Sequence, residues 1–267
     1  MKLKEKIGLV GVGNMGGAIL EGLLAKGIAA AGQIWIYDKV TEKAAEFKSR
    51  LKVNAAASNA ALVQKTDIII LAVKPQDLAA TLGEMKSEFR SAQILISILA
   101  GTPLQKIRDA AGVKLDMVRA MPNLGAKVGE SLTALTGTSP GALSMAETIF
   151  LGCGKTLRLD EKYFDLITAL SGSGPAYFFY LMELLAKEGQ ERGLSKDEAR
   201  LVAIQTAAGA ALLAAASAED PSVWRERVTS KGGTTEAALK ELIKFWPQSV
   251  RDAIQAAQDR GKELSQG

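Results

Sequence analysis

The 267-residue sequence contains no histidine and only one cysteine, Cys153. Without histidine the chain builds neither a Ser-His-Asp nor a Cys-His triad, and one cysteine is too few for a zinc site, so we expect no metal. A single cysteine also forms no intrachain disulfide, which favours a reducing compartment and predicts a cytoplasmic protein. Any catalysis therefore relies on a bound cofactor, carboxylates, lysines, hydroxyls or backbone groups.

Basic clusters and a strongly apolar span are also lacking. The 33 Lys and Arg residues and the 29 Asp and Glu residues are dispersed and leave a net charge of +4, so we expect no nucleic-acid partner. Residues 201–218 carry no charge and approach the about 20 residues of a membrane span, but they are mostly alanine. The N-terminal lysines and apolar run resemble a signal peptide, yet glycines interrupt them. We therefore expect no membrane partner and interpret residues 201–218 as a tightly packed helix in a soluble core.

The first 160 residues alternate short apolar runs with helical segments. Strands rich in Ile, Leu or Val, typical of parallel strands covered on both faces, are predicted at residues 7–10, 34–37, 67–73, 94–99 and 117–120. Helices are predicted at residues 15–26, 41–50, 59–65 and 76–88. This alternation predicts an α/β fold, with an N-terminal Rossmann-type doubly wound sheet over residues 1–160.

The predicted strands disappear after residue 160. Helices are predicted at residues 163–170, 175–192, 195–218, 234–245 and 247–264. Pro175 and Pro247 stand at predicted first turns, and Gly193 is a predicted helix stop. Two of these helices are long and rich in small or apolar residues, and a unit of about 100 residues offers little depth to bury them. We expect an all-α domain over residues 161–267 that dimerises with a second copy; a compact monomeric bundle is the alternative.

A glycine motif, Gly11-Val12-Gly13-Asn14-Met15-Gly16, directly follows the first predicted strand and opens the first predicted helix. In this context G-x-G-x-x-G indicates a dinucleotide site. Gly11 allows the tight turn, Gly13 lets a pyrophosphate approach the backbone, and Gly16 lets the helix pack on the strand. The helix N-terminus then offers unpaired N–H groups to the phosphates.

The second predicted strand ends at Asp38 and Lys39, where the ribose of a dinucleotide is usually bound. Asp38 would accept a hydrogen bond from a ribose 2′-hydroxyl and favour NADH, whereas Lys39 would attract the 2′-phosphate of NADPH; the choice between the two stays open. Ligands in such sheets bind beyond the carboxyl ends of the strands, so further cofactor contacts are predicted at Ala72, Val73, Lys74, Pro75, Ala100, Gly101 and Asn123. Ordinary strand-end turns explain the same residues equally well.

The helical half has two unusual segments. Ser171-Gly172-Ser173-Gly174-Pro175 precedes one predicted helix, and Thr229-Ser230-Lys231-Gly232-Gly233-Thr234-Thr235 precedes another. Two glycines flanked by hydroxyls at a helix start form a backbone nest suited to a carboxylate or phosphate. An ordinary capped loop is the alternative.

Five motifs, in this order and spacing, give the chain a resemblance to the pyrroline-5-carboxylate reductases: G-V-G-N-M-G, L-A-V-K-P-Q, R-A-M-P-N, A-L-S-G-S-G-P-A-Y and V-T-S-K-G-G-T-T-E-A-A-L. The resemblance covers nearly the whole chain. It implies NAD(P)H-dependent formation of L-proline from the cyclic imine pyrroline-5-carboxylate, in intertwined dimers that often assemble into decamers. By position it implies cofactor contacts at the glycine motif, Asn59, Ala72–Lys74 and Ala100.

The resemblance also implies a substrate loop, formed by Ser230, Gly232, Gly233, Thr234 and Thr235. In this interpretation the Thr235 hydroxyl orients the imine nitrogen as the catalytic group. Two positions depart from the family pattern: Lys231 replaces a usual proline, and Leu124-Gly125 replaces a common Thr-Pro.

Two rival interpretations remain. One is a β-hydroxyacid dehydrogenase, but the lysine that such an enzyme needs is missing from residues 174–179. The other is a non-catalytic NAD(P) sensor, which would be expected to have a degraded substrate loop.

Overall fold

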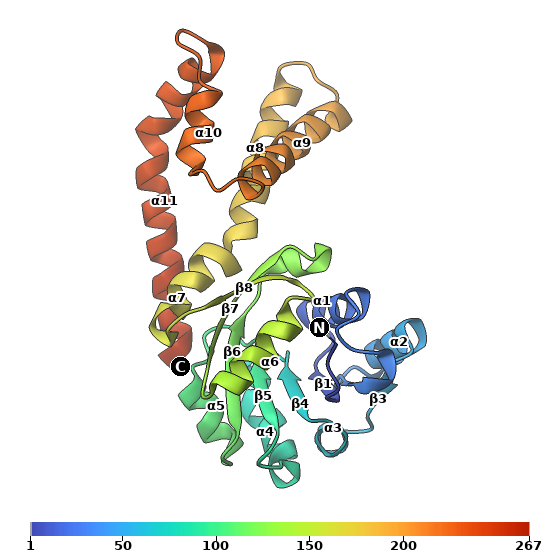
Figure 1. Ribbon diagram of the computed structural model, residues 1–267. Coiled ribbons are helices and arrows are strands. Elements are labelled where there is room, and N and C mark those ends of the chain that lie inside the picture. Colours follow the sequence, from blue (N-terminus) through green and yellow to red (C-terminus); the bar gives the residue numbers. More distant parts are fainter. Residues whose placement is uncertain (1, 267) are drawn as a thin grey trace. The chain divides into compact units, whose positions relative to one another are not determined.

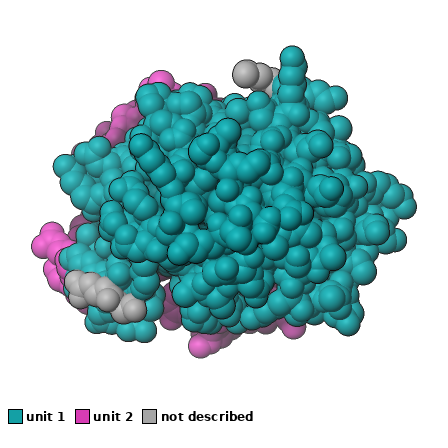
Figure 2. All heavy atoms as spheres, turned by 90° about the horizontal axis from the view of Figure 1, so that it is seen from below, with its two compact units in different colours: residues 1–173, 257–267 teal, residues 174–256 magenta. Residues whose placement is uncertain are grey.

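The computed structural model describes residues 2–266, and the chain divides into two compact units (Figure 1). Figure 2 colours the first unit, residues 1–173 with 257–267, teal and the second, residues 174–256, magenta. Compactness therefore separates the chain at residue 173, whereas the loss of predicted strands suggested residue 160.

The first unit is built on one sheet of eight strands in the order β3-β2-β1-β4-β5-β6-β7-β8. The strands are β1 (Ile7–Val10), β2 (Ile34–Tyr37), β3 (Asn54–Ala55), β4 (Ile68–Leu71), β5 (Ile94–Ser97), β6 (Asp116–Met121), β7 (Ser131–Gly137) and β8 (Gly154–Arg158). Neighbouring strands run parallel except β6 and β7, which pair antiparallel. The predicted Rossmann-type fold of this part is confirmed.

Successive side chains of the central strands belong alternately to two separate hydrophobic cores. In β4, Ile68 and Ile70 belong to one apolar cluster, while Ile69 and Leu71 belong to the other. All four residues are at most 1% exposed. Because successive strand side chains point to opposite faces, each face must be covered, and this explains the continuous apolar runs in the sequence.

Helices cover both faces of the sheet (Figure 1). They are α1 (Asn14–Ala25), α2 (Thr41–Leu51), α3 (Asn59–Lys65), α4 (Leu78–Met85), α5 (Leu104–Ala111) and α6 (Pro140–Phe150); the short helix α7 (Phe164–Ile167) follows β8. A five-residue π-helical turn, Thr168–Gly172, follows α7. Five elements of this unit, α5, α6, β3, β7 and β8, were not predicted: α5 and β3 are short, and β8 (GKTLR) is a half-exposed strand at the sheet edge without an apolar run.

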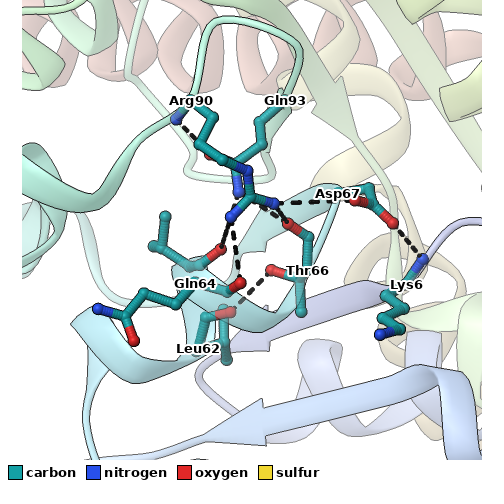
Figure 3. A network of polar contacts seen from close by, with 8 residues as sticks. Lys6, Leu62, Gln64, Thr66, Asp67, Arg90 and Gln93 are labelled. Carbon is teal, nitrogen blue, oxygen red and sulfur yellow. Dashed lines mark hydrogen bonds and ion pairs between the residues drawn. The ribbon is translucent and has the colours of Figure 1, made fainter.

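Figure 3 shows how the C-terminal end of α3 is tied to the loop before β5. The Arg90 guanidinium donates to the carbonyls of Gln64 and Thr66, at 3.1 and 2.8 Å. The buried Gln93 amide donates to the Thr66 carbonyl at 2.7 Å. The last carbonyls of a helix have no partners within the helix, so these side chains satisfy them and hold α3 beside β4.

The second unit is helical, with α8 (Gly174–Glu191), α9 (Lys196–Ala215), α10 (Pro221–Arg227) and most of α11 (Thr234–Gln266). Pro175 lies in the first turn of α8, and Gly193 ends that helix with φ +101°, as predicted. The prediction for Pro247 was wrong, because this residue lies inside the continuous helix α11. A proline lacks the N–H that would donate to the carbonyl four residues earlier in the helix. Here that carbonyl belongs to Ile243, an exposed residue, so water can replace the missing donor.

Residues 174–256 bury very little within one chain. Only Gly174, Ala199 and Ala203 of this described stretch are buried, while Phe178 and Leu212 are 64% and 69% exposed. By length and composition α9 resembles a membrane span, and only 11% of its apolar window is buried within the single chain. The predicted packing of this helix in a soluble core is therefore not provided by a single chain, and apolar surface of this extent indicates an interface with a second copy.

We expect Phe178→Glu to lower the molar mass in solution. A charge placed in an apolar interface is left without a partner and opposes association. Multi-angle light scattering at micromolar concentration should give at least a dimer for the wild type and a smaller species for this variant. Gln190→Glu, which adds the same charge at an exposed polar position of α8, should leave the assembly intact; a monomeric wild type would contradict the interface.

Candidate active site

The glycine turn after β1 has the geometry that a dinucleotide site requires. Gly11 has φ +95°, and a Cβ there would lie 2.6 Å from the Ala72 carbonyl oxygen. A Cβ at Gly16 would overlap the Gly11 carbonyl oxygen, whereas nothing lies within 4 Å of the corresponding position at Gly13. Gly11 and Gly16 therefore allow the backbone to pack closely, and Gly13 leaves the approach to the turn open. Since Gly13 starts α1 without a capping side chain, the first amides of the helix stay available to an anion.

Asp38 fastens this turn from the end of β2. Its Oδ2 accepts the Val12 N–H and its Oδ1 accepts the Val40 N–H, both at 2.9 Å. Lys39, the next residue, forms an ion pair with Asp77 at 2.9 Å. Both carboxylate oxygens of Asp38 thus already hold the backbone, so this carboxylate positions the turn even before any ribose is bound.

A cavity of about 360 Å³ opens beside the turn. Three lysines from different segments line it, namely Lys39, Lys43 and Lys74, together with Asp38 and Asn59. Asn59 is 5% exposed; its Nδ2 donates to Glu84 at 2.7 Å, and its Oδ1 is buried without a hydrogen-bond partner. An unpaired buried polar atom costs about 1–3 kcal/mol, so an amide oxygen at this cavity fits a donor group of a ligand.

A second cavity, of about 300 Å³, lies beyond the ends of β4, β5 and β6. Its lining includes Met15, Ala72, Val73, Ala100 and Asn123. Ala72 and Val73, at the end of β4, line both cavities. The two cavities therefore lie on either side of this strand end and together form one extended site. The sheet thereby brings together predicted cofactor residues from five strand ends.

Among the predicted cofactor residues outside the glycine turn, Pro75 and Gly101 are exceptions, because they line neither cavity. Pro75 opens the short 3-10 turn Pro75–Asp77. Gly101 has φ +60°, and a Cβ there would lie 2.9 Å from the Cβ of Leu264. The structure therefore explains Gly101 by close packing against the last turns of α11.

Asn123 is held on both sides of its amide. Its Nδ2 donates to the Ser171 hydroxyl at 3.0 Å, and its Oδ1 accepts the Gly125 N–H at 2.9 Å. A Cβ at Gly125 would lie 2.6 Å from the Glu130 carbonyl oxygen. Asn123 thus shapes the wall of the second cavity, and the Leu124-Gly125 departure fits a tight backbone contact in the same loop.

The predicted substrate loop, described within the helical unit alone, directly precedes α11. The Gly232 N–H donates to Glu236 Oε2 at 2.6 Å, and the Gly233 N–H donates to the Ser230 carbonyl at 3.0 Å. Gly232 has φ +72°, which favours glycine. Both glycine amides of the predicted nest are therefore engaged within the chain, and the first amides of α11, at Thr234 and Thr235, remain as helix-end donors.

Three notable residues were missed by the sequence analysis. Lys43 lies four residues after Lys39, in the first turn of α2, and this closeness in sequence could have indicated a shared basic site. Glu236 could have been found as an acidic residue in the first turn of a predicted helix, where a carboxylate is favourable. Arg119, buried in β6, forms an ion pair with Glu161 at 3.1 Å, and the same Glu161 oxygen accepts the Leu104 N–H at 2.7 Å.

Thiolate and metal chemistry have little support in the described residues. Burial raises the pKa of the Cys153 thiol to about 11, so this thiol stays protonated at neutral pH. Among residues 2–266, no three His, Cys, Asp or Glu side chains are grouped as a metal site would require.

Comparisons with known proteins cover both parts of the chain. The profile described as "NADP oxidoreductase coenzyme F420-dependent" matches residues 6–101, and that described as "Pyrroline-5-carboxylate reductase dimerisation" matches residues 161–264. The pyrroline-5-carboxylate reductase of Pseudomonas aeruginosa is 35% identical, over 98% of this chain and 97% of its own length. Pyrroline-5-carboxylate reductase 2 of Bacillus subtilis is 35% identical, over 98% and 96%. The chain belongs to the pyrroline-5-carboxylate reductase family.

Solved structures of the family agree with this assignment. A pyrroline-5-carboxylate reductase from Coxiella burnetii has a TM-score of 0.92 at 32% identity, covering 98% of this chain and 99% of its own. The Plasmodium falciparum enzyme with NADP bound has a TM-score of 0.88 at 28% identity, covering 99% and 100%. The resemblance stated from the motifs is confirmed, as is a helical domain that associates with a second copy. A 3-hydroxyisobutyrate dehydrogenase shares the fold alone, at 16% identity and a TM-score of 0.53.

Two glycine variants should separate cofactor binding from folding. Gly13→Ala adds a methyl group in open space at φ −70°, so the melting temperature should stay near that of the wild type while NADPH binds about tenfold or more weakly. Gly11→Ala adds the same group at a positive φ against a carbonyl, and should cost about 1–3 kcal/mol of stability.

Thermal unfolding and fluorescence titration with NADPH provide the two measurements. Unchanged NADPH affinity in a folded Gly13→Ala variant would rule out this turn as the pyrophosphate site.

Proposed function

We propose that this chain reduces the C=N bond of 1-pyrroline-5-carboxylate with NADPH or NADH, forming L-proline in the last step of proline biosynthesis. The observation that carries the proposal is family similarity along nearly the whole chain, including both the glycine turn and the Ser230–Thr235 loop. The chain is accordingly an NAD(P)-dependent oxidoreductase acting on a C–N bond.

The first unit supplies the residues that would hold the dinucleotide. The free amides of Asn14 and Met15 suit the pyrophosphate, above the open position of Gly13. Asn59 Oδ1 suits a donor of the adenosine half, and the cavity lined by Val73 and Ala100 suits the nicotinamide half. When bound, the cofactor supplies the hydride.

The loop before α11 supplies the residues for a carboxylated cyclic imine. Ser230 and the amides of Gly232, Thr234 and Thr235 suit the carboxylate, with Gly233 shaping the turn. The Thr235 hydroxyl would hydrogen-bond the ring nitrogen and relay its proton. A protonated imine is already an electrophile, so reduction needs no strong acid, which fits a chain without histidine.

The cofactor cavity favours NADPH over NADH. Lys39, Lys43 and Lys74 all line it, and their three positive charges suit a 2′-phosphate. The acidic residue that would otherwise select a ribose hydroxyl, Asp38, already accepts two backbone N–H groups. Asp77, which pairs with Lys39, offers little opposition, because Lys39 is 72% exposed and a surface ion pair is easily exchanged.

The assembly follows from the helical unit. We infer a homodimer formed through residues 161–267, with dimers assembling further into decamers. We further infer a cytoplasmic enzyme whose partner is a small molecule rather than a membrane or a nucleic acid.

The Thr235→Ala variant tests the assignment of the substrate loop. It removes one hydrogen bond to the reacting ring, so kcat/KM for pyrroline-5-carboxylate should fall about 10- to 1000-fold. Cofactor oxidation followed at saturating NADPH gives this value. Thr235→Ser should restore most of the activity; equal rates for Thr235→Ala and wild type would exclude the role.

The Lys39→Gln variant tests cofactor selectivity. Loss of one charge beside a 2′-phosphate should lower kcat/KM for NADPH by a factor of about 3–10 and leave that for NADH nearly unchanged. Lys48→Gln, an exposed lysine further along α2 and outside the cavity, is the matched control. Parallel losses with both cofactors would refute a 2′-phosphate contact at Lys39.

A further inference from the structure

The amide of Gly232 is occupied by a carboxylate of the chain itself. Glu236 Oε2 accepts the Gly232 N–H at 2.6 Å, the short distance expected of a hydrogen bond to a charged acceptor. Glu236 lies four residues further along, in the first turn of α11, so the side chain reaches back over the start of its own helix.

Glu236 has a second partner within reach. Its Oε1 lies 3.4 Å from Lys240 Nζ, one helical turn further along α11. The side chain of Glu236 is 33% exposed and that of Lys240 is 68% exposed, so both have room to change rotamer. Glu236 can therefore leave Gly232 without becoming an isolated charge.

A substrate carboxylate has the same chemistry as the Glu236 side chain. Two carboxylates at one amide repel each other, and a single N–H donates one strong hydrogen bond. The loop is not crowded at this residue, since nothing lies within 4 Å of a Cβ built at Gly232. The position held by Glu236 is thus one that an external carboxylate would also seek.

We propose that Glu236 is an internal competitor of the substrate carboxylate, which holds the Gly232 amide in the free enzyme and moves to Lys240 when substrate binds. This inference rests on the proposed function, in which the Ser230–Thr235 loop receives the carboxylate. The apparent affinity of a site is reduced by the fraction of molecules in which it is open, so Glu236 raises KM.

Helix capping gives a different account of the same contact. In a capping box the third helical residue accepts the amide of the N-cap residue. Here the Gly233 amide is bonded to the Ser230 carbonyl instead, and Glu236 reaches Gly232, one residue beyond. Removing a cap that only stabilises the loop would leave KM unchanged or raise it, whereas removing a competitor lowers KM.

The test uses the full-length enzyme with saturating NADPH. Glu236→Gln keeps the shape and removes the charge, and KM for pyrroline-5-carboxylate should fall by a factor of about 3–30, with the effect on KM rather than on kcat. Glu236→Ala should lower KM in the same direction. The inhibition constant of L-proline should fall in parallel, while that of L-prolinamide, which lacks the carboxylate, should not.

Glu241→Gln is the matched control, because Glu241 lies on the same helix, pairs with Lys244 at 2.7 Å and carries the same charge. Its KM should equal that of the wild type. An unchanged or raised KM in folded Glu236→Gln and Glu236→Ala, an equal shift for L-prolinamide, or a loss confined to kcat would overturn the inference. Absence of imine reduction by the wild type would instead refute the proposed function.

Discussion

The approach of the glycine turn to the end of β4 is the contact on which the cofactor-binding unit depends. Gly11 lies so close to the Ala72 carbonyl that a side chain at Gly11 would separate the turn from the end of β4, and a side chain at Gly16 would push α1 away from the Gly11 carbonyl. Because Ala72 and Val73 line both cavities, this one contact also sets the distance between the two halves of the dinucleotide site. Sheet packing and cofactor recognition therefore place the same demand on the backbone.

The two units solve the problem of burial in opposite ways. In the first, β1 and β4 are completely covered by the chain's own helices, so the unit is stabilised by its own core. In the second, long helices present aromatic and aliphatic side chains outward, and a single chain leaves them in water. The match of this unit to the family's dimerisation domain indicates that a second copy covers these side chains.

The parts of the fold that the sequence predicted well are those dominated by one local signal. The bounds of β1, β2 and α3 match their predicted ranges because apolar runs and glycine or serine boundaries decide them. Elements at the sheet edge, such as β8, escaped because polar residues face solvent there and no run forms. The prediction of a helix start at Pro247 was wrong because exposed helix carbonyls tolerate a missing donor.

In the site, the roles of the glycines could be predicted because only glycine meets the steric requirements of these positions. The hydrogen-bond partners of the polar side chains could not be predicted. That Asp38 holds backbone amides, and that Glu236 occupies the amide of Gly232, depends on side-chain directions that spacing does not specify. Motifs therefore located the functional segments, whereas the donors still available within them became visible only in three dimensions.

The chain's one thiol lies at 0% exposure against the α1 face, where a Cβ at Gly22 would be 3.2 Å from Cys153 Sγ. A protonated, inaccessible sulfur reacts slowly with alkylating reagents. A cysteine introduced at any exposed position would thus be the sole accessible nucleophile of its kind. This makes the protein suitable for single-site attachment of fluorophores or spin labels without first removing a native residue.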